Sequence, residues 1–358
     1  MKKLLILSTA LTGLAFAANA DVTVMSWGGA YGNAQNEAHL KPFTASTGIK
    51  TVMLDSDNPA TPVKAMVEAN NVTMDVVSVE YADAIRLCDE GLLEPIDAAA
   101  LPAGSDGVAA TEDFLAGAIT ECAVSTDIWA TIWAYDTTKF PADAAPKVAA
   151  DFFDLEKFPG KRGVRKGAKA VLEFALMADG VAPADVYTTL GTPEGIDRAF
   201  AKLDTIKDSI VWWEAGAQPP QLLADGEVVM TTAYNGRIFN AAMTEGKPFQ
   251  IVWDAQSYEN EMYAVPKGAP NKDEAMQFIA FATSTEGLRE QAKYISYGPA
   301  RKSAFIEPLI FSDGKTDMAA HLPTAPANLA NALESSFEFW VDRDSELNER
   351  FNAWLAAN

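Results

Sequence analysis

Aromatic and acidic side chains follow two strand-like runs in the first quarter of the chain. The first run leads into Trp27 and Tyr31 within the glycine-rich stretch SWGGAYG, and the second, which ends at Val79, leads into Glu80 and Tyr81. Aromatic rings offer flat apolar faces and attract ammonium groups, and a carboxylate can hydrogen-bond the same cation. Ligands of open α/β sheets bind beyond the carboxyl ends of strands. These residues therefore predict a binding site for a small solute.

Residues for nucleophilic or metal chemistry are scarce. The chain has no G-x-S-x-G, H-E-x-x-H or G-x-x-x-x-G-K-[ST] motif, and its two histidines, His39 and His321, are far apart in sequence. We therefore expect a binding protein and not an enzyme, with no cofactor and no metal site. Two alternatives stay open: a secreted hydrolase that works with paired carboxylates, and a metal receptor that uses Tyr294 and Tyr297.

The N-terminus and the cysteines both indicate an exported protein. Residues 1–20, MKKLLILSTALTGLAFAANA, have a basic start, an apolar run and a small-x-small end, the pattern of a Sec-type signal peptide. We therefore expect a periplasmic location. In an oxidising compartment the simplest expectation for Cys88 and Cys122 is one disulfide, with two buried free thiols as the alternative.

The net charge of the chain disfavours negatively charged partners. The net charge is −21, and removing Lys2 and Lys3 with a cleaved leader leaves 26 basic and 49 acidic residues, or −23. Such a surface repels nucleic acid and anionic lipid.

The length of the chain indicates two domains, because the about 338 residues that remain after the leader are too many for one small core.

Strand-like and helix-like runs alternate, which predicts an α/β fold with mainly parallel sheets flanked by helices. We predict a first lobe of 21–130 plus about 260–310 and a second lobe of 131–259 plus about 311–358. Chain crossings near 128–137 and 251–265 would act as the hinge, with the ligand in the cleft between the lobes. The expected helices include Asn33–Ser46, Lys169–Ala178, Asp273–Ala282 and a terminal helix pair within 334–356.

Five segments in order resemble the extracellular solute-binding proteins of ABC importers, nearest the spermidine/putrescine-binding branch. They are MSWGGAY…FTASTGIK, MDVVSVEYADAIRLCDEGLLEPID, ADGEVVMTTAYNGRIFNA, YAVPKGAPNKDEAMQFIAFATSTE and YISYGPARKSA. The resemblance implies a two-lobed, type II-like periplasmic-binding-protein fold that closes like a clamshell. It also implies a monomer that delivers its solute to an inner-membrane ABC permease.

The same resemblance implies a set of ligand-binding residues. The positions that match the family's site are Trp27, Tyr31, Glu80 or Tyr81, Tyr234, Glu261 and Tyr297. One region departs from the polyamine branch, which carries two acids at the start of a second-lobe helix. Here the sequence is basic, RKGAKA at 165–170, and this departure disfavours a long di- or triamine.

The residues around this site are consistent with two kinds of solute. Our main expectation is a small, polyamine-like amine held by aromatic rings and by Glu261. Arg237 directly follows Asn235-Gly236, and a guanidinium there could bind a carboxylate. The alternative is therefore a zwitterionic ω-amino acid, such as γ-aminobutyrate, or a betaine. Second-lobe contacts would come from Gln218 and from Glu214 and Trp213, which end a strand beside Trp212.

Overall fold

A computed structural model describes residues 21–357, so the expected leader at 1–20 lies outside the described residues. These residues form one mixed sheet with the strand order β2-β1-β3-β8-β4-β7-β5-β6, and β9 pairs with β8. The strands are β1 (Val22–Ser26), β2 (Thr51–Asp55), β3 (Val76–Glu80), β4 (Ala123–Asp136), β5 (Arg162–Arg165), β6 (Ile210–Trp213), β7 (Met230–Tyr234), β8 (Phe249–Ala264) and β9 (Leu333–Glu334).

Helices cover both ends of this sheet. The α-helices are α1 (Gly29–Gln35), α2 (Lys41–Thr47), α3 (Thr61–Glu68), α4 (Tyr81–Asp89), α5 (Ala110–Asp113), α6 (Ala149–Phe153), α7 (Val171–Ala178), α8 (Val186–Leu190), α9 (Pro193–Asp204), α10 (Gln218–Ala224), α11 (Asn235–Met243), α12 (Lys272–Ala282), α13 (Thr285–Ala292) and α14 (Phe337–Ala356). Short 3₁₀ turns occupy Ala98–Ala100, Pro183–Asp185, Lys207–Ser209, Lys302–Phe305 and Met318–His321. None of the helices within 21–357 combines the length and apolar character that a membrane crossing requires.

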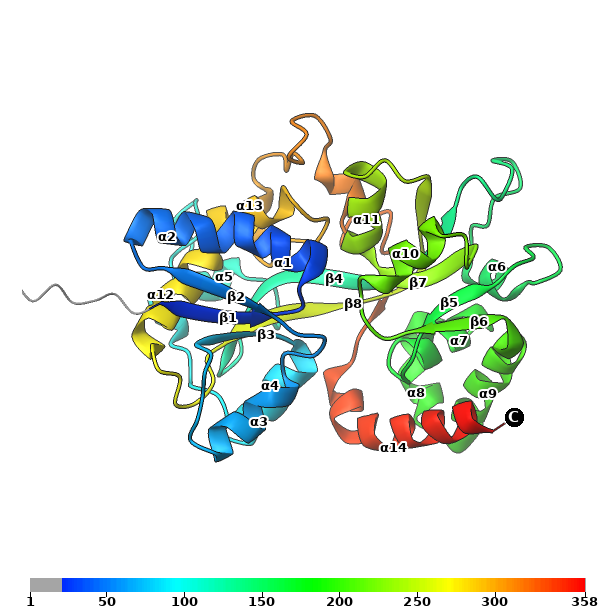
Figure 1. The fold of residues 1–358 in the computed structure, drawn as a ribbon, viewed down its shortest axis with the longest axis horizontal. Coiled ribbons are helices and arrows are strands. Elements are labelled where there is room, and N and C mark those ends of the chain that lie inside the picture. The colour runs from blue at the N-terminus through cyan, green and yellow to red at the C-terminus, as the bar shows by residue number, and fades with distance from the viewer. Residues whose placement is uncertain (1–20, 358) are drawn as a thin grey trace, which may run out of the picture.

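The elements gather into two groups joined by two long strands (Figure 1). One group contains the parallel strands β1–β3 with α1–α5, α12 and α13, and the other contains β5–β7 with α6–α11 and α14. Strands β4 and β8 run antiparallel to each other through both groups. We call the two groups the first and the second lobe. The expected α/β, two-lobed class is confirmed, and the residue boundaries of the lobes stay a prediction.

Each lobe has its own apolar core. The largest cluster lies in the second lobe and packs α6–α9 against α14 through buried side chains such as Phe152, Leu172 and Phe351. In the first lobe, one cluster contains Phe43 and Phe278, and another contains Val77 and Leu87. The expected helix Asp273–Ala282 is present as α12, and it packs into the first of these two clusters.

Three expectations about elements need correction. The helix expected at Asn33–Ser46 begins earlier, at Gly29, and passes through a π-helical turn at Asn36–Leu40. The C-terminal segment is one 20-residue helix, α14, after the short strand β9, and not a pair of helices. The return crossing expected near 251–265 lies in a single 16-residue strand, β8, which begins at Phe249 and ends at Ala264.

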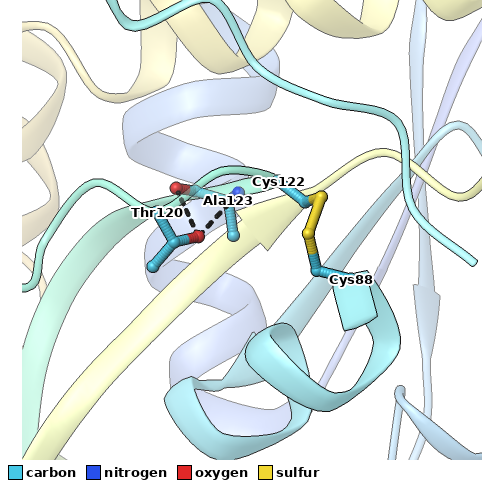
Figure 2. The surroundings of a disulfide bond; sticks show 4 residues. All are labelled: Cys88, Thr120, Cys122 and Ala123. Atoms are coloured by element: carbon cyan, nitrogen blue, oxygen red, sulfur yellow. Dashed lines mark hydrogen bonds between the residues drawn. A yellow bond between two sulfur atoms is a disulfide. The ribbon is translucent and has the colours of Figure 1, made fainter. Parts of the chain in front are cut away.

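The expected disulfide is present. Cys88, on α4, and Cys122, just before β4, are bonded with a Cα–Cα distance of 5.8 Å, which lies within the usual range for disulfides. Figure 2 shows the bond beside Thr120, whose Oγ1 accepts from the backbone N–H of Ala123. The disulfide therefore ties a first-lobe helix to the start of a connecting strand.

Candidate ligand-binding site

A cavity lies where the carboxyl ends of the parallel strands of both lobes meet. Trp27 follows β1, Glu80 ends β3, Arg165 ends β5 and Tyr234 ends β7, and Glu261 comes from the connecting strand β8. This placement is the one expected for ligands of open α/β sheets. The full lining is Trp27, Tyr31, Asp57, Glu80, Trp129, Arg165, Glu214, Gly216, Tyr234, Arg237, Glu261 and Tyr297.

Glu261 provides the acidic end of the cavity. Its Oε1 accepts hydrogen bonds from Trp27 Nε1 and from Ser78 Oγ, both at 2.7 Å. Its Oε2 makes no hydrogen bond to any residue of the described chain. The side chain is only 3% exposed, and burial raises the pKa of Glu261 well above its usual value, with the nearby Asp127 adding to the rise. A ligand ammonium would supply the counter-charge that this carboxylate lacks.

A second buried carboxyl, Asp127, lies next to Glu261, because the two residues are register partners on β4 and β8. Its Oδ2 accepts from the Tyr31 hydroxyl at 2.9 Å and from Gln291 Nε2 at 2.6 Å. Burial raises the pKa of Asp127 to about 7 although these donors favour the charged form. Tyr31 is thus held at the floor of the cavity, with its ring 5.4 Å from that of Tyr297.

Aromatic rings form one wall. The Tyr234 ring packs edge-on against Trp129, at 5.1 Å between centroids, and against Trp213, at 5.6 Å. A Cβ at Gly216 would lie 2.8 Å from the Tyr234 ring, so the glycine lets the loop after β6 approach the ring closely. Trp129 Nε1 is buried without a hydrogen-bond partner among residues 21–357 and is available to a ligand.

Two arginines provide the basic side. The Arg165 guanidinium lies 5.9 Å from the centre of the Tyr234 ring and makes no hydrogen bond or ion pair within 21–357. Arg237 donates from its two terminal nitrogens to the backbone carbonyls of Gly28, at 3.1 Å, and Trp27, at 3.4 Å. Its Nε is buried and has no partner in the described part of the chain. Both side chains can therefore donate to a carboxylate.

A lysine pairs with Glu80 but is not itself among the residues that line the cavity. Lys169 Nζ lies 2.8 Å from Glu80 Oε2 and 2.8 Å from Glu259 Oε2. The expected helix over Lys169–Ala178 begins later, at Val171, so Lys169 is in the loop after β5. This loop reaches from the second lobe to the end of a first-lobe strand.

Three of the predicted site residues lie outside the cavity. Tyr81 begins α4 and points the other way, with its ring 5.2 Å from Phe337. Trp213 is buried behind Tyr234 and touches the site only through that ring, whereas Trp212 packs on Phe351 and Trp354. Gln218 accepts from the backbone N–H groups of Glu214 and Ala215 and thereby shapes the loop that carries Glu214. The other seven predicted residues line the cavity.

Sequence reasoning missed four lining residues, Asp57, Trp129, Arg165 and Gly216, whereas Glu214 was expected as a second-lobe contact and lines the cavity. Arg165 was visible as part of a basic stretch that departs from the polyamine branch, but its role depends on where β5 ends. Trp129 was hidden in the apolar run IWATIWAY, where a core position and a cavity position look alike. Among residues 21–357, no group of three or more His, Cys, Asp or Glu side chains could hold a metal ion.

The sequence profile of the bacterial extracellular solute-binding proteins matches residues 38–321. A gamma-aminobutyric acid-binding protein from Pseudomonas aeruginosa PAO1 is 49% identical over 352 residues, which cover 97% of this chain and 95% of that protein. A spermidine/putrescine-binding periplasmic protein from Escherichia coli K12 is more distant. It is 25% identical over 284 residues, or 76% of this chain and 77% of that protein.

Two solved structures are similar to this chain over most of its length. A periplasmic binding protein from Agrobacterium tumefaciens R10, in complex with agropinic acid, has a TM-score of 0.80 and 32% identity, and the match covers 94% of this chain and 98% of that one. A receptor described as binding GABA, the same compound as γ-aminobutyrate, has a TM-score of 0.78 and 34% identity over the same shares of the two chains. The chain therefore has the two-lobed fold of periplasmic binding proteins.

Proposed function

This chain belongs to the family of bacterial extracellular solute-binding proteins, and from that premise we propose that it captures a short zwitterionic ω-amino acid of the γ-aminobutyrate type. The resemblance expected from the sequence is thereby confirmed at the level of the family. Members of this family and the relatives named above are solute receptors, so the hydrolase alternative is not retained. The solute would be delivered to the permease of an ABC importer from the periplasm.

One observation carries the choice of solute. The Arg165 guanidinium, which has no protein partner within 21–357, lines the same cavity as the unpaired Oε2 of Glu261. An amino acid with separated charges would place its carboxylate at Arg165 and the Nε of Arg237, and its ammonium at Glu261. The methylene chain would lie against the rings of Tyr234 and Trp129. Both ends of the ligand would then be paired with an opposite charge.

A polyamine-like amine, our main expectation from the sequence, is less well supported. A diamine brings two positive charges into a cavity that already contains Arg165 and Arg237. Desolvating an ammonium beside a guanidinium is unfavourable, because like charges repel more strongly at low dielectric. The relative at 49% identity binds gamma-aminobutyric acid by its name, and this supports the zwitterion as well.

Calorimetric titration with γ-aminobutyrate and with putrescine tests the proposal. We expect the wild-type protein to bind γ-aminobutyrate and to prefer it over putrescine. Arg165→Met and Glu261→Gln should each weaken γ-aminobutyrate binding by about tenfold to a hundredfold, because each removes one charge-assisted hydrogen bond worth about 1.5–3 kcal/mol.

Arg198→Met is the matched control. Arg198 is exposed, pairs with Asp179 at 2.7 Å and lies away from the cavity, so its loss should leave the Kd unchanged. Tight binding of putrescine with no response to γ-aminobutyrate would reject the zwitterion in favour of an amine. An unchanged Kd in Arg165→Met would remove the residue on which the proposed orientation depends.

A further inference from the structure

Four carboxylates lie on one face of the adjoining strands β3, β8 and β4 beside the cavity. Glu259 and Glu261 are two positions apart on β8, so their side chains point to the same face. Glu80 is the register partner of Glu261 on β3, and Asp127 is its register partner on β4. Partners directly opposite each other also share a face. This face would attract more than one positive charge.

Lys169 neutralises the other two carboxylates of this face, Glu80 and Glu259. Its Nζ bridges Glu80 and Glu259 at 2.8 Å each, and the three side chains are 15%, 12% and 8% exposed. The next residue, Ala170, has a φ of 66°, a left-handed conformation that is unfavourable for a residue with a Cβ. The loop thus carries a strained backbone directly beside Lys169.

We propose that Lys169 determines specificity: it occupies the place that a second ligand ammonium would take and so excludes diamines from a site for amino acids. This inference rests on the proposed function, because it takes the Glu261 end of the cavity as the one that holds the first ammonium. Glu80 lines the cavity, and without Lys169 it would be the acceptor for the far end of a diamine.

The charges around Glu80 agree with this role. Burial alone would raise the pKa of Glu80, but attraction to Lys169 and Arg165 lowers it below its usual value, so Glu80 is ionised and paired. Burial raises the pKa of Glu259 to about 7, despite Lys169. The two acids and two bases at this end of the cavity nearly balance, and removing the lysine leaves an excess of negative charge.

Lys169→Met and the slightly more polar Lys169→Gln test the inference. We expect the affinity for putrescine to rise by about tenfold or more relative to wild type, equivalent to one new charge-assisted hydrogen bond. The ratio of putrescine to γ-aminobutyrate affinity should shift toward putrescine, a change that a general loss of stability would not produce. Lys169→Arg should keep the wild-type preference, since it keeps the positive charge.

Two further variants sharpen the test. In Lys169→Met/Glu80→Gln the gain for putrescine should disappear, because Glu80 is the one of the two freed acids that lines the cavity. Lys157→Met is the matched control: Lys157 also pairs with an acid, Asp151, but is 58% exposed and remote from the cavity, so the preference should not change.

The outcomes separate this inference from the proposed function. If wild type fails to bind γ-aminobutyrate, the proposed function fails first. If wild type binds γ-aminobutyrate but neither folded Lys169 variant gains affinity for putrescine, the role of Lys169 is overturned and the proposed function stands. Folding of each variant is checked by its thermal transition, and Glu80→Gln alone provides a test that leaves Lys169 intact. It should leave putrescine excluded, and a gain of putrescine affinity there would contradict the inference.

Discussion

Glu261 and Asp127 form a buried pair of acids that touch no cation within residues 21–357. Their donors are neutral: Trp27 and Ser78 for Glu261, and Tyr31 with other neutral groups for Asp127. Ionising both of two adjacent carboxyl groups at low dielectric is costly, because the two negative charges repel each other. Unless a solute brings a cation to them, at least one of the two holds a proton near neutral pH, and this has a consequence for stability.

Asp127→Asn should change how stability depends on pH. The pKa of Asp127 is about 7 in the folded protein and about 3.9 when unfolded, so between these values the folded state holds a proton that the unfolded state has lost. Its contribution to the free energy of unfolding therefore falls as pH rises from about 4 to 7. Asparagine does not titrate, so the variant Asp127→Asn lacks this loss of stability with rising pH. We expect the free energy of unfolding of the variant, relative to that of wild type, to rise by about 2 kcal/mol between pH 5 and pH 8, as measured by urea unfolding.

The amide introduced by Asp127→Asn is a suitable test of that titration because its oxygen can accept the hydrogen bonds that Asp127 Oδ2 receives. Glu173 is also buried, its pKa is likewise raised to about 7, and it remains in both proteins, so part of the slope persists in the variant. Parallel stability curves for wild type and variant across this range would show that Asp127 does not titrate there.

At this scale the sequence predicted the aromatic and acidic residues better than the basic ones. Trp27 and Glu80 were found because they directly follow strands, and Glu261 because it matches a family motif. Arg165 and Lys169 were noticed as basic but not assigned to the site. Their roles depend on the end of β5 and the turn before α7, which place both side chains near the other lobe. The propensities of residues for strand or helix do not predict in which direction such side chains point.

The C-terminal helix α14 is the element whose role was least visible in the sequence. Its loosely spaced aromatics indicated packing but not a single continuous helix. In the structure it runs along the second lobe (Figure 1), and Trp340, Leu347 and Phe351 enter the largest core cluster. Trp340 Nε1 also donates to Glu173 Oε1 at 2.7 Å. The helix thus contributes buried side chains to the second-lobe core, in addition to those from residues 131–259.

Phe351→Ala should destabilise the protein by about 3–5 kcal/mol, the usual cost of truncating a buried aromatic ring. Phe351 is fully buried and packs edge-on against Trp212 with ring centres 5.6 Å apart. Val341→Ala, on the same helix but 44% exposed, should cost about 0.5 kcal/mol or less. Urea unfolding of both variants measures the difference, and equal losses would mean that α14 is not part of the core.

Strand connectivity was predicted less well than strand location. The alternation of strands and helices indicated parallel sheets, and β1–β3 and β5–β7 are parallel. The long strands β4 and β8 were expected only as crossings near 128–137 and 251–265, because polar residues such as Asp127 and Glu261 interrupt the apolar pattern. Both strands continue through these buried acids, because β4 and β8 pair along most of their length with Asp127 opposite Glu261.

At the scale of the whole molecule, side chains of the two lobes meet around the cavity. Arg237, on the second-lobe helix α11, donates to the carbonyls of Trp27 and Gly28 in the first lobe. Lys169 pairs with Glu80, and Tyr81 packs against Phe337 at the start of α14. These contacts connect segments distant in sequence, and an order of elements alone cannot predict which side chains meet across a cleft.

Gly29→Ala should weaken solute binding by preventing full closure of the lobes. A Cβ at Gly29 would lie 2.3 Å from the Arg237 guanidinium, so closure would displace that group from its two carbonyl partners. We expect the Kd for γ-aminobutyrate to rise by about tenfold or more, and small-angle scattering to show less compaction on adding the solute. Gly91→Ala is the matched control, because Gly91 has a similar left-handed φ of 70° but nothing within 4 Å of the added carbon. Both alanines carry the same backbone strain, of about 1 kcal/mol. If the two variants weaken binding equally, the effect comes from strain and not from contact across the cleft.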